Sequence, residues 1–305
     1  MKRKVIQLAE KTFVVSLPST WVKKYGVQKS DELRVEEKHN ALVISTDGAI
    51  EVPESISVDI SGLTEGFVKS IVSVLHKVGY DEIEFLYDDP VLAALVCKRT
   101  EELIGFEVVE QTPKRVVIKN VSGDLTHELD SMVRRTFLVT LSLAESVASM
   151  IAKGQLSELQ SLLPLEKTSN RLTNYCHRLL NKQSRGSQTV FLYTILSVLE
   201  SIGDEFRDIC LSLHTAESLP RAELVGLLQK VGQHLRKYYA HFYDAGVDNM
   251  EALRKENAGL ASELKEMETR SAADRVLLAH LFVVVQRIYD CFGSTTGRKF
   301  LQAHA

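Results

Sequence analysis

Residues 1–46 read MKRKVIQLAEKTFVVSLPSTWVKKYGVQKSDELRVEEKHNALVIST, a stretch that combines positive charge with short apolar runs. Residues 4–8 and 12–17 are β-branched and apolar, which predicts two strands joined by a turn at 9–11. A short helix is predicted to begin at Pro18 and to stop at Gly26. A second pair of strands is predicted over 32–37 and 41–45, with a turn at His39 and Asn40. So few short elements bury too little apolar surface to fold alone, and dimerisation is expected.

Positive charge is concentrated in the same stretch. Residues 1–29 carry seven lysines and arginines against one acid, Glu10, for a net charge of +6, although the whole chain carries −3. Extending the count to residue 46 gives +4, which leaves −7 for the rest of the chain. This split indicates that the N-terminal end meets a polyanion and that the remainder does not.

Several short motifs follow one another in this stretch: Arg3-Lys4-Val5, Lys11, Val14-Val15-Ser16-Leu17-Pro18, Trp21-Val22-Lys23-Lys24-Tyr25-Gly26-Val27 and Asp31-Glu32-Leu33. Together they resemble the SpoVT/AbrB swapped-hairpin family. The resemblance implies that two intertwined chains form one barrel whose basic face lies on DNA. The bases that it places against DNA are Arg3, Lys11, Lys23 and Lys24, to which proximity adds Lys2 and Lys4. The chain departs from the family pattern at Ala9, in a first turn without glycine, and at Ser30, which replaces the usual glycine.

An alternative interpretation makes these bases the solvated surface of a unit that only dimerises. We favour contact with DNA because the bases are clustered. Contact with phosphates would be sensitive to salt and weakly selective for sequence, since no helix beyond the short one is available to read bases.

Length and composition limit the classes of protein to which the chain can belong. A chain of 305 residues, 45% of them hydrophobic, has room for two or three domains. Its four cysteines stand singly with no CxxC pair, which suits a reducing compartment. No apolar run approaches the roughly eighteen residues of a spanning helix. We therefore expect a cytoplasmic protein without membrane insertion.

Residues 48–122 predict a small α/β connector domain. Strands are expected at 56–60, 82–87, 106–110 and 115–121, with helices at 64–78 and 90–104. The first helix is expected to present one apolar face, formed by Phe67, Ile71, Val74, Leu75 and Val78. Asp88 and Asp89 precede the second helix, where an acidic N-cap explains them better than a cation site.

Residues 123–305 predict a helical domain. Six helices are expected at 125–153, 156–182, 188–215, 219–245, 248–269 and 272–301. Leu199-Glu200-Ser201-Ile202-Gly203-Asp204 recurs weakly at 285–290, and 165–172 aligns with 253–260. The offsets of 86 and 88 residues indicate two copies of a three-helix unit.

This duplicated unit, with its Glu200 to Asp204 motif, resembles PhoU, the phosphate-uptake regulator family. The resemblance implies pairs of acids, four residues apart on two helices of each bundle, that can hold iron or zinc. Glu200 and Asp204 match one pair, and Glu166 matches half of the other, where Asn170 replaces an acid. These three acids are the candidate site for a divalent, iron or zinc ion, and no cofactor is certain.

The alternative, that Glu200 and Asp204 pair with a nearby arginine or lysine or simply line a solvated groove, is favoured over metal binding. The second copy lacks the acid pattern. It has Gln286 with Asp290 on one helix, and Arg254 with Ala258 on the other.

The predicted fold is multidomain α+β. It comprises a dimeric swapped-hairpin β-barrel (1–47), the α/β connector (48–122) and a duplicated three-helix, PhoU-like domain (123–305). The resemblances imply a homodimeric DNA-binding regulator of phosphate uptake, whose helical domain contacts a phosphate-transporter component or a sensor kinase. The runner-up is a protein-binding regulator of a phosphate transporter whose N-terminal unit only dimerises. No catalytic residue is indicated and an enzyme is not expected; a metal-dependent enzyme using Glu200 and Asp204 is the third class.

Overall fold

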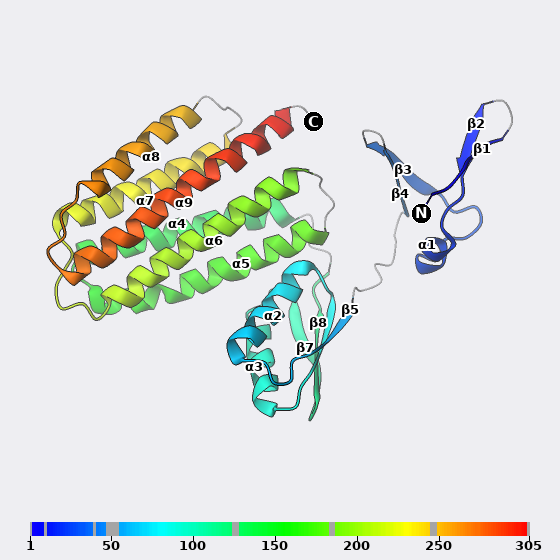
Figure 1. Cartoon of the computed structure of the whole chain (residues 1–305), viewed down its shortest axis with the longest axis horizontal. Coiled ribbons are helices and arrows are strands. Elements are labelled where there is room, and N and C mark those ends of the chain that lie inside the picture. The colour runs from blue at the N-terminus through cyan, green and yellow to red at the C-terminus, as the bar shows by residue number, and fades with distance from the viewer. Residues whose placement is uncertain are drawn as a thin grey trace. The chain divides into compact units, whose positions relative to one another are not determined.

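The computed structural model describes residues 2–8, 11–38, 41–46, 55–123, 128–182, 187–244 and 249–303. The chain is mixed α and β, about 65% helical, with small sheets towards the N-terminus and a helical C-terminal region (Figure 1). It divides into two compact units, residues 1–54 and 55–305. The domain boundary that the sequence predicts after residue 47 lies in residues 47–54, which are outside the described residues.

The first unit contains two antiparallel hairpins and one short helix (Figure 1). Its elements agree with the predicted ones to within two residues, and the turns predicted at 9–10 and 39–40 lie outside the described residues. Each hairpin is a separate two-stranded sheet, and the described residues of one chain close no barrel. The elements are β1 (Val5–Leu8), β2 (Thr12–Val15), α1 (Ser19–Lys24), β3 (Leu33–Lys38) and β4 (Ala41–Thr46).

Two left-handed residues turn the chain from α1 into β3. Gly26 has φ +63° and ends the helix, as predicted, and Ser30 has φ +78°. Asp31 follows, and its Oδ2 accepts a hydrogen bond of 2.7 Å from the backbone N–H of Gln28. Ser30 therefore adopts a conformation that glycine takes without a steric penalty.

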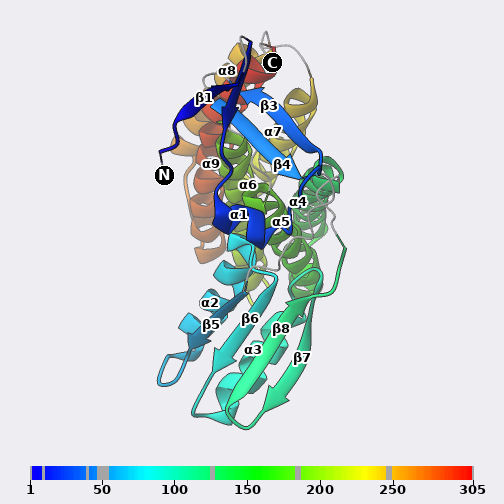
Figure 2. The same ribbon diagram turned by 90° about the vertical axis from the view of Figure 1, so that its right-hand side faces the viewer.

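The second unit begins with a four-stranded sheet in the order β5-β6-β8-β7. β5 and β6 are parallel, and the other pairings are antiparallel. Figures 1 and 2 show α2 and α3 on one face of this sheet. The predicted β-α-β-α-β-β order is confirmed. The elements are β5 (Ser55–Asp59), α2 (Glu65–Val78), β6 (Glu82–Leu86), α3 (Pro90–Thr100), β7 (Phe106–Thr112) and β8 (Arg115–Asn120).

Local chemistry sets the ends of the two helices. Gly79, with φ +117°, caps α2. The side chain of Asp89 accepts a hydrogen bond of 2.8 Å from the N–H of Val91, so it is an N-cap of α3, as predicted. That helix ends at Thr100, four residues before its predicted end, and a tight turn leads on to β7.

The predicted apolar face of α2 is confirmed only in part: Ile71 and Leu75 are partly buried and pack against the core, but the other three residues do not. Phe67, Val74 and Val78 are exposed. The buried side chains are instead Val68, Val72, Ser73 and His76. The two polar ones have partners: Ser73 Oγ accepts from Arg99 Nε at 2.8 Å, and His76 Nε2 lies 3.3 Å from the carbonyl oxygen of Ile104. Ser73 can therefore be buried at little cost, whereas Nδ1 of His76 is buried without a hydrogen-bond partner among the described residues.

The rest of the unit consists of long helices (Figure 1). They agree with the six predicted ones, except that residues 156–162 form a 3₁₀ helix rather than the start of an α-helix. Pro164 follows in the first turn of the next α-helix, where its missing N–H has no bond to lose. The elements are α4 (Leu129–Ala152), η2 (Leu156–Leu162), α5 (Leu163–Lys182), α6 (Ser187–Leu213), α7 (Ala222–Tyr243), α8 (Met250–Lys265) and α9 (Ala272–Ala303).

These helices pack in two groups of three. Each of α4, α5 and α6 contacts the other two, and the same is true of α7, α8 and α9. The groups meet where α6 lies along α9 and α4 along α7, and one hydrophobic core runs through both. A second, separate core lies between the sheet and the pair α2 and α3.

Among the residues that the structure describes, two helices are long and apolar enough to cross a membrane, by length and composition alone. They are α4, with a mean hydropathy of 1.3, and α9, with 1.5. In α4, half of the apolar window is buried inside the protein. Core helices of soluble proteins pass the same test, so this property does not identify a membrane segment.

Candidate functional site

The six bases expected to contact DNA lie at three places in the first unit. Three of them precede β1, one stands between the strands of the first hairpin, and two lie in the last turn of α1. All are exposed, and none forms an ion pair with a residue in the described part of the chain. Lys24 Nζ lies 5.2 Å from the centre of the Tyr25 ring. The bases are Lys2, Arg3, Lys4, Lys11, Lys23 and Lys24.

The described residues of the same unit form no core of their own. None of its described residues is buried, and eight large apolar side chains are between 40% and 67% exposed. In the first hairpin, Val5 and Val15 face each other across the strands, while Ile6 and Leu8 point to the other side. Both faces of this hairpin are therefore apolar. The eight side chains are Val5, Ile6, Leu8, Phe13, Val15, Val35, Leu42 and Val43.

Two of the three acids expected to hold a metal pair with an arginine instead. Arg207 of α6 contacts Asp204 on the same helix and lies 3.2 Å from Glu166 Oε1 of α5. Glu166 is only 4% exposed, and burial raises the pKa of its carboxyl, which Arg207 partly offsets. Asn170 Nδ2 donates to Glu166 Oε1 at 2.5 Å. Part of this pairing could be predicted from the sequence, because Arg207 follows Asp204 by one helical turn.

Glu200 stands apart from this pairing. It lies one turn before Asp204, and no other described residue forms an ion pair with it. Burial raises the pKa of its carboxyl, and the nearby Lys77 opposes that shift. Within the described ranges, no group of three or more acids, histidines or cysteines could hold a metal ion. A cation at Glu166 and Asp204 would have to displace the Arg207 guanidinium, so these residues do not fit a metal as they stand.

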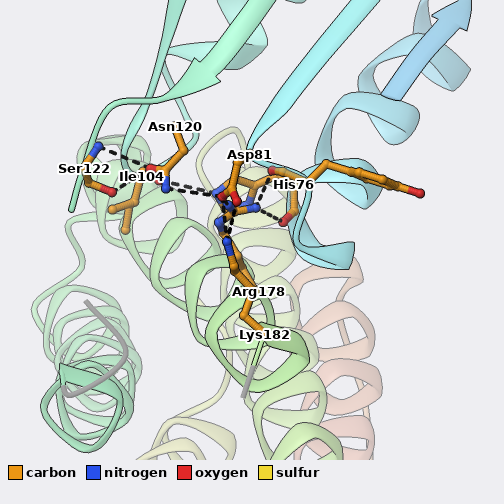
Figure 3. A network of polar contacts seen from close by, with 8 residues as sticks. His76, Asp81, Ile104, Asn120, Ser122, Arg178 and Lys182 are labelled. Carbon is orange, nitrogen blue, oxygen red and sulfur yellow. Dashed lines mark hydrogen bonds and ion pairs between the residues drawn. The ribbon is translucent and has the colours of Figure 1, made fainter. Parts of the chain in front are cut away.

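A buried cluster that the sequence did not reveal joins the α/β part to the helical part. Figure 3 shows Arg178 and Lys182 of α5 reaching Asp81, which precedes β6. Arg178 is only 2% exposed and contacts Asp81 through Nη2. Lys182 Nζ lies 2.7 Å and 2.6 Å from the two carboxylate oxygens of Asp81. Asp81 and Arg178 are 97 residues apart in the sequence, so no local sequence pattern predicts their contact.

Arg178 also caps the C-terminal end of α2. Its Nη1 donates to the carbonyl oxygens of His76 at 3.1 Å and Tyr80 at 2.6 Å. A guanidinium is favourable there because the last carbonyls of a helix carry partial negative charge. His76 is buried beside it, and burial, reinforced by Arg178, lowers the pKa of this histidine to about 3. The cluster therefore fixes α2 to α5 through charge and backbone contacts.

Comparison of the chain with protein-family models, with curated protein sequences and with solved structures gave no match.

Proposed function

We propose that this protein is a cytoplasmic, homodimeric DNA-binding regulator of phosphate uptake or of the phosphate response. In this proposal, residues 1–47 of two chains form a SpoVT/AbrB-like barrel on DNA, and the helical domain is a PhoU-like body that controls it. The input reaches the body through a partner such as a phosphate-transporter component or a sensor kinase, or through a small ligand.

The observation that carries the proposal is that the described residues of the first unit form no core. An isolated two-stranded hairpin is marginally stable in water. Burying a Val, Leu, Ile or Phe side chain contributes about 1.5–3 kcal/mol, so eight exposed ones leave on the order of 10 kcal/mol or more unrealised in a single chain. A second copy of the chain exposes the same apolar side chains, including those on both faces of its first hairpin. Interleaving of the two copies covers both faces, which supports the swapped-hairpin barrel.

The six exposed bases support DNA as the target of that barrel. A dimer would present twelve of them, without competing ion pairs among the described residues. Phosphate groups are the partner that clustered, unpaired lysines and arginines favour.

The arrangement of the helices supports the second half of the proposal. Two groups of three mutually contacting helices agree with a duplicated three-helix unit. The ion pairs of Arg207 with Glu166 and Asp204 favour control through a partner or a ligand rather than through a metal at these acids. Such control would act by changing the separation of the two DNA-binding halves, because a dimer reads half-sites only at a fixed spacing.

A gel-shift assay of the intact protein on its own upstream DNA, repeated over several salt concentrations, tests the DNA-binding function. Lys23→Ala with Lys24→Ala removes four bases from a dimer. If each contacts one phosphate, the slope of log K against log salt becomes shallower by about 3 to 4. Lys153→Ala with Lys265→Ala is the matched control, since both are exposed lysines without an ion pair to a described residue.

Absence of binding at low salt, or the same slope for both double variants, would overturn the DNA-binding proposal. A protein that dimerises but never binds DNA would support the runner-up, a protein-binding regulator of a phosphate transporter.

A further inference from the structure

A cavity of about 270 Å³ lies where the α/β part meets the helical part. Residues of α3 and the turn after it, of α5 and of α6 line it. Pockets for drug-sized molecules measure about 300–1,000 Å³, so this cavity suits a smaller ligand.

The lining of this cavity is cationic. Four bases face two carboxylates, a formal excess of two positive charges. One of the carboxylates, Glu166, is buried and already forms an ion pair with Arg207. The charged residues are Arg99, Lys167, Arg171, Arg207, Glu102 and Glu166.

Two of the four bases have no counter-ion in the described part of the chain. Lys167 and Arg171 lie one turn apart on α5, both exposed, and neither forms an ion pair with a residue that the structure describes. Like charges at this spacing repel each other. The side chains of the other two are already held in place. Arg99 contacts Glu102 and Ser73, and Arg207 pairs with Glu166 and Asp204. An anion in the cavity would therefore meet both free and pre-positioned donors.

The same cavity also offers unpaired acceptors. Asn174 is only 6% exposed, and its Oδ1 has no hydrogen-bond partner among the residues that the structure describes. Asn170 Oδ1 is also buried without a partner, while its Nδ2 is engaged by Glu166. Buried amide oxygens are rarely left unpaired, so each calls for a donor. The cavity thus favours a ligand that is an anion and also carries a hydrogen-bond donor, such as an O–H group.

We propose that this cavity binds inorganic phosphate. At pH 7 phosphate keeps at least one P–O–H, which can donate to the amide oxygen of Asn174, while its other oxygens accept from Arg171 and Lys167. Sulfate has no such proton, and a phosphate monoester, whose second pKa is about 6, has mostly lost it. The assignment rests on the chemistry of the cavity; its use as an effector site would rest on the proposed function.

Isothermal titration of the full-length protein at pH 7 and matched ionic strength tests the site without DNA. We expect one phosphate per chain, with sulfate and glycerol phosphate each binding at least tenfold more weakly. Arg171→Gln should weaken phosphate binding at least tenfold. Arg135→Gln is the matched control, an exposed arginine on α4 without an ion pair to a described residue, and should leave binding unchanged.

A second variant addresses the acceptor. Asn174→Leu, checked for an unchanged melting temperature, should reduce the preference for phosphate over sulfate to less than threefold. Equal affinity of the wild type for phosphate and sulfate, tighter binding of the monoester, or no heat at millimolar phosphate would each overturn the proposal. So would an equal effect of Arg171→Gln and Arg135→Gln. None of these outcomes depends on DNA binding, so a failure here is distinct from a failure of the gel-shift test.

Discussion

Replacing Asp81 by asparagine tests whether the buried cluster holds the α/β part on the helical part. The variant keeps the size of the side chain but removes its charge, which leaves Arg178 and Lys182 without their shared counter-ion. Removing one partner of a buried ion pair typically costs about 3–5 kcal/mol. The Lys182 side chain is 21% exposed, and water screens its part of the interaction. We therefore expect a loss near the lower limit, about 3 kcal/mol.

Urea and thermal denaturation followed by circular dichroism measure this loss. For a unit of roughly 250 residues, about 3 kcal/mol corresponds to a melting temperature lower by about 6–12 °C. Hydrogen exchange should accelerate first in α2 and β6, which the cluster joins to α5. Glu84→Gln is the control: its pair with Arg115, at 3.1 Å, is partly exposed, and such pairs contribute about 0–1 kcal/mol.

A double-mutant cycle separates the ion pair from the rest of the site. Asp81→Asn combined with Arg178→Met should cost less than the sum of the single variants by about 1–3 kcal/mol, because the two residues interact directly. Strict additivity, or a loss for Asp81→Asn no larger than that for Glu84→Gln, would refute the argument that this cluster couples the two parts.

Three further predictions concern the first unit and a buried histidine. Phe13→Glu should halve the mass found by sedimentation equilibrium, because it places a charge in the proposed dimer core. Val91→Glu, at an exposed site on α3, should leave the mass unchanged. A dimeric Phe13→Glu protein would contradict the proposed interface. Ser30→Gly should raise the free energy of unfolding of the first unit by about 0.5–1 kcal/mol by relieving its left-handed backbone, and an unchanged urea midpoint would show that no strain is present. Burial lowers the pKa of His177 from 6.5 to about 4, so its contribution to stability is present above pH 6.5 and is lost as the pH falls towards 4. His177→Gln should therefore reduce the loss of stability between pH 7 and pH 5 by about 2 kcal/mol, and an unchanged pH dependence would exclude this histidine as a source of acid sensitivity.

The order and type of the elements could be predicted because their signals are local. Gly79, Asp89 and Pro90 act on the backbone within one turn of themselves, so the ends that they set for α2 and α3 follow from neighbouring residues alone. Apolar periodicity likewise located the long helices, since a helix needs an apolar stripe wherever it is finally packed. The 3₁₀ segment at 156–162 was missed because its pattern continues that of the helix after it.

What only the tertiary structure decided is which residues meet. On α2 the apolar pattern indicated a face through Phe67, but the buried face includes His76, because Ile104 and Arg178 from distant segments give that region its partners. In the same way, Arg207 reaches Glu166 from another helix and forms an ion pair with a residue of the predicted metal site. The sequence of one chain determined the charge, the helices and the strands of this protein. Contacts between segments decided its candidate sites, because burial and pairing depend on distances in space that no local pattern encodes.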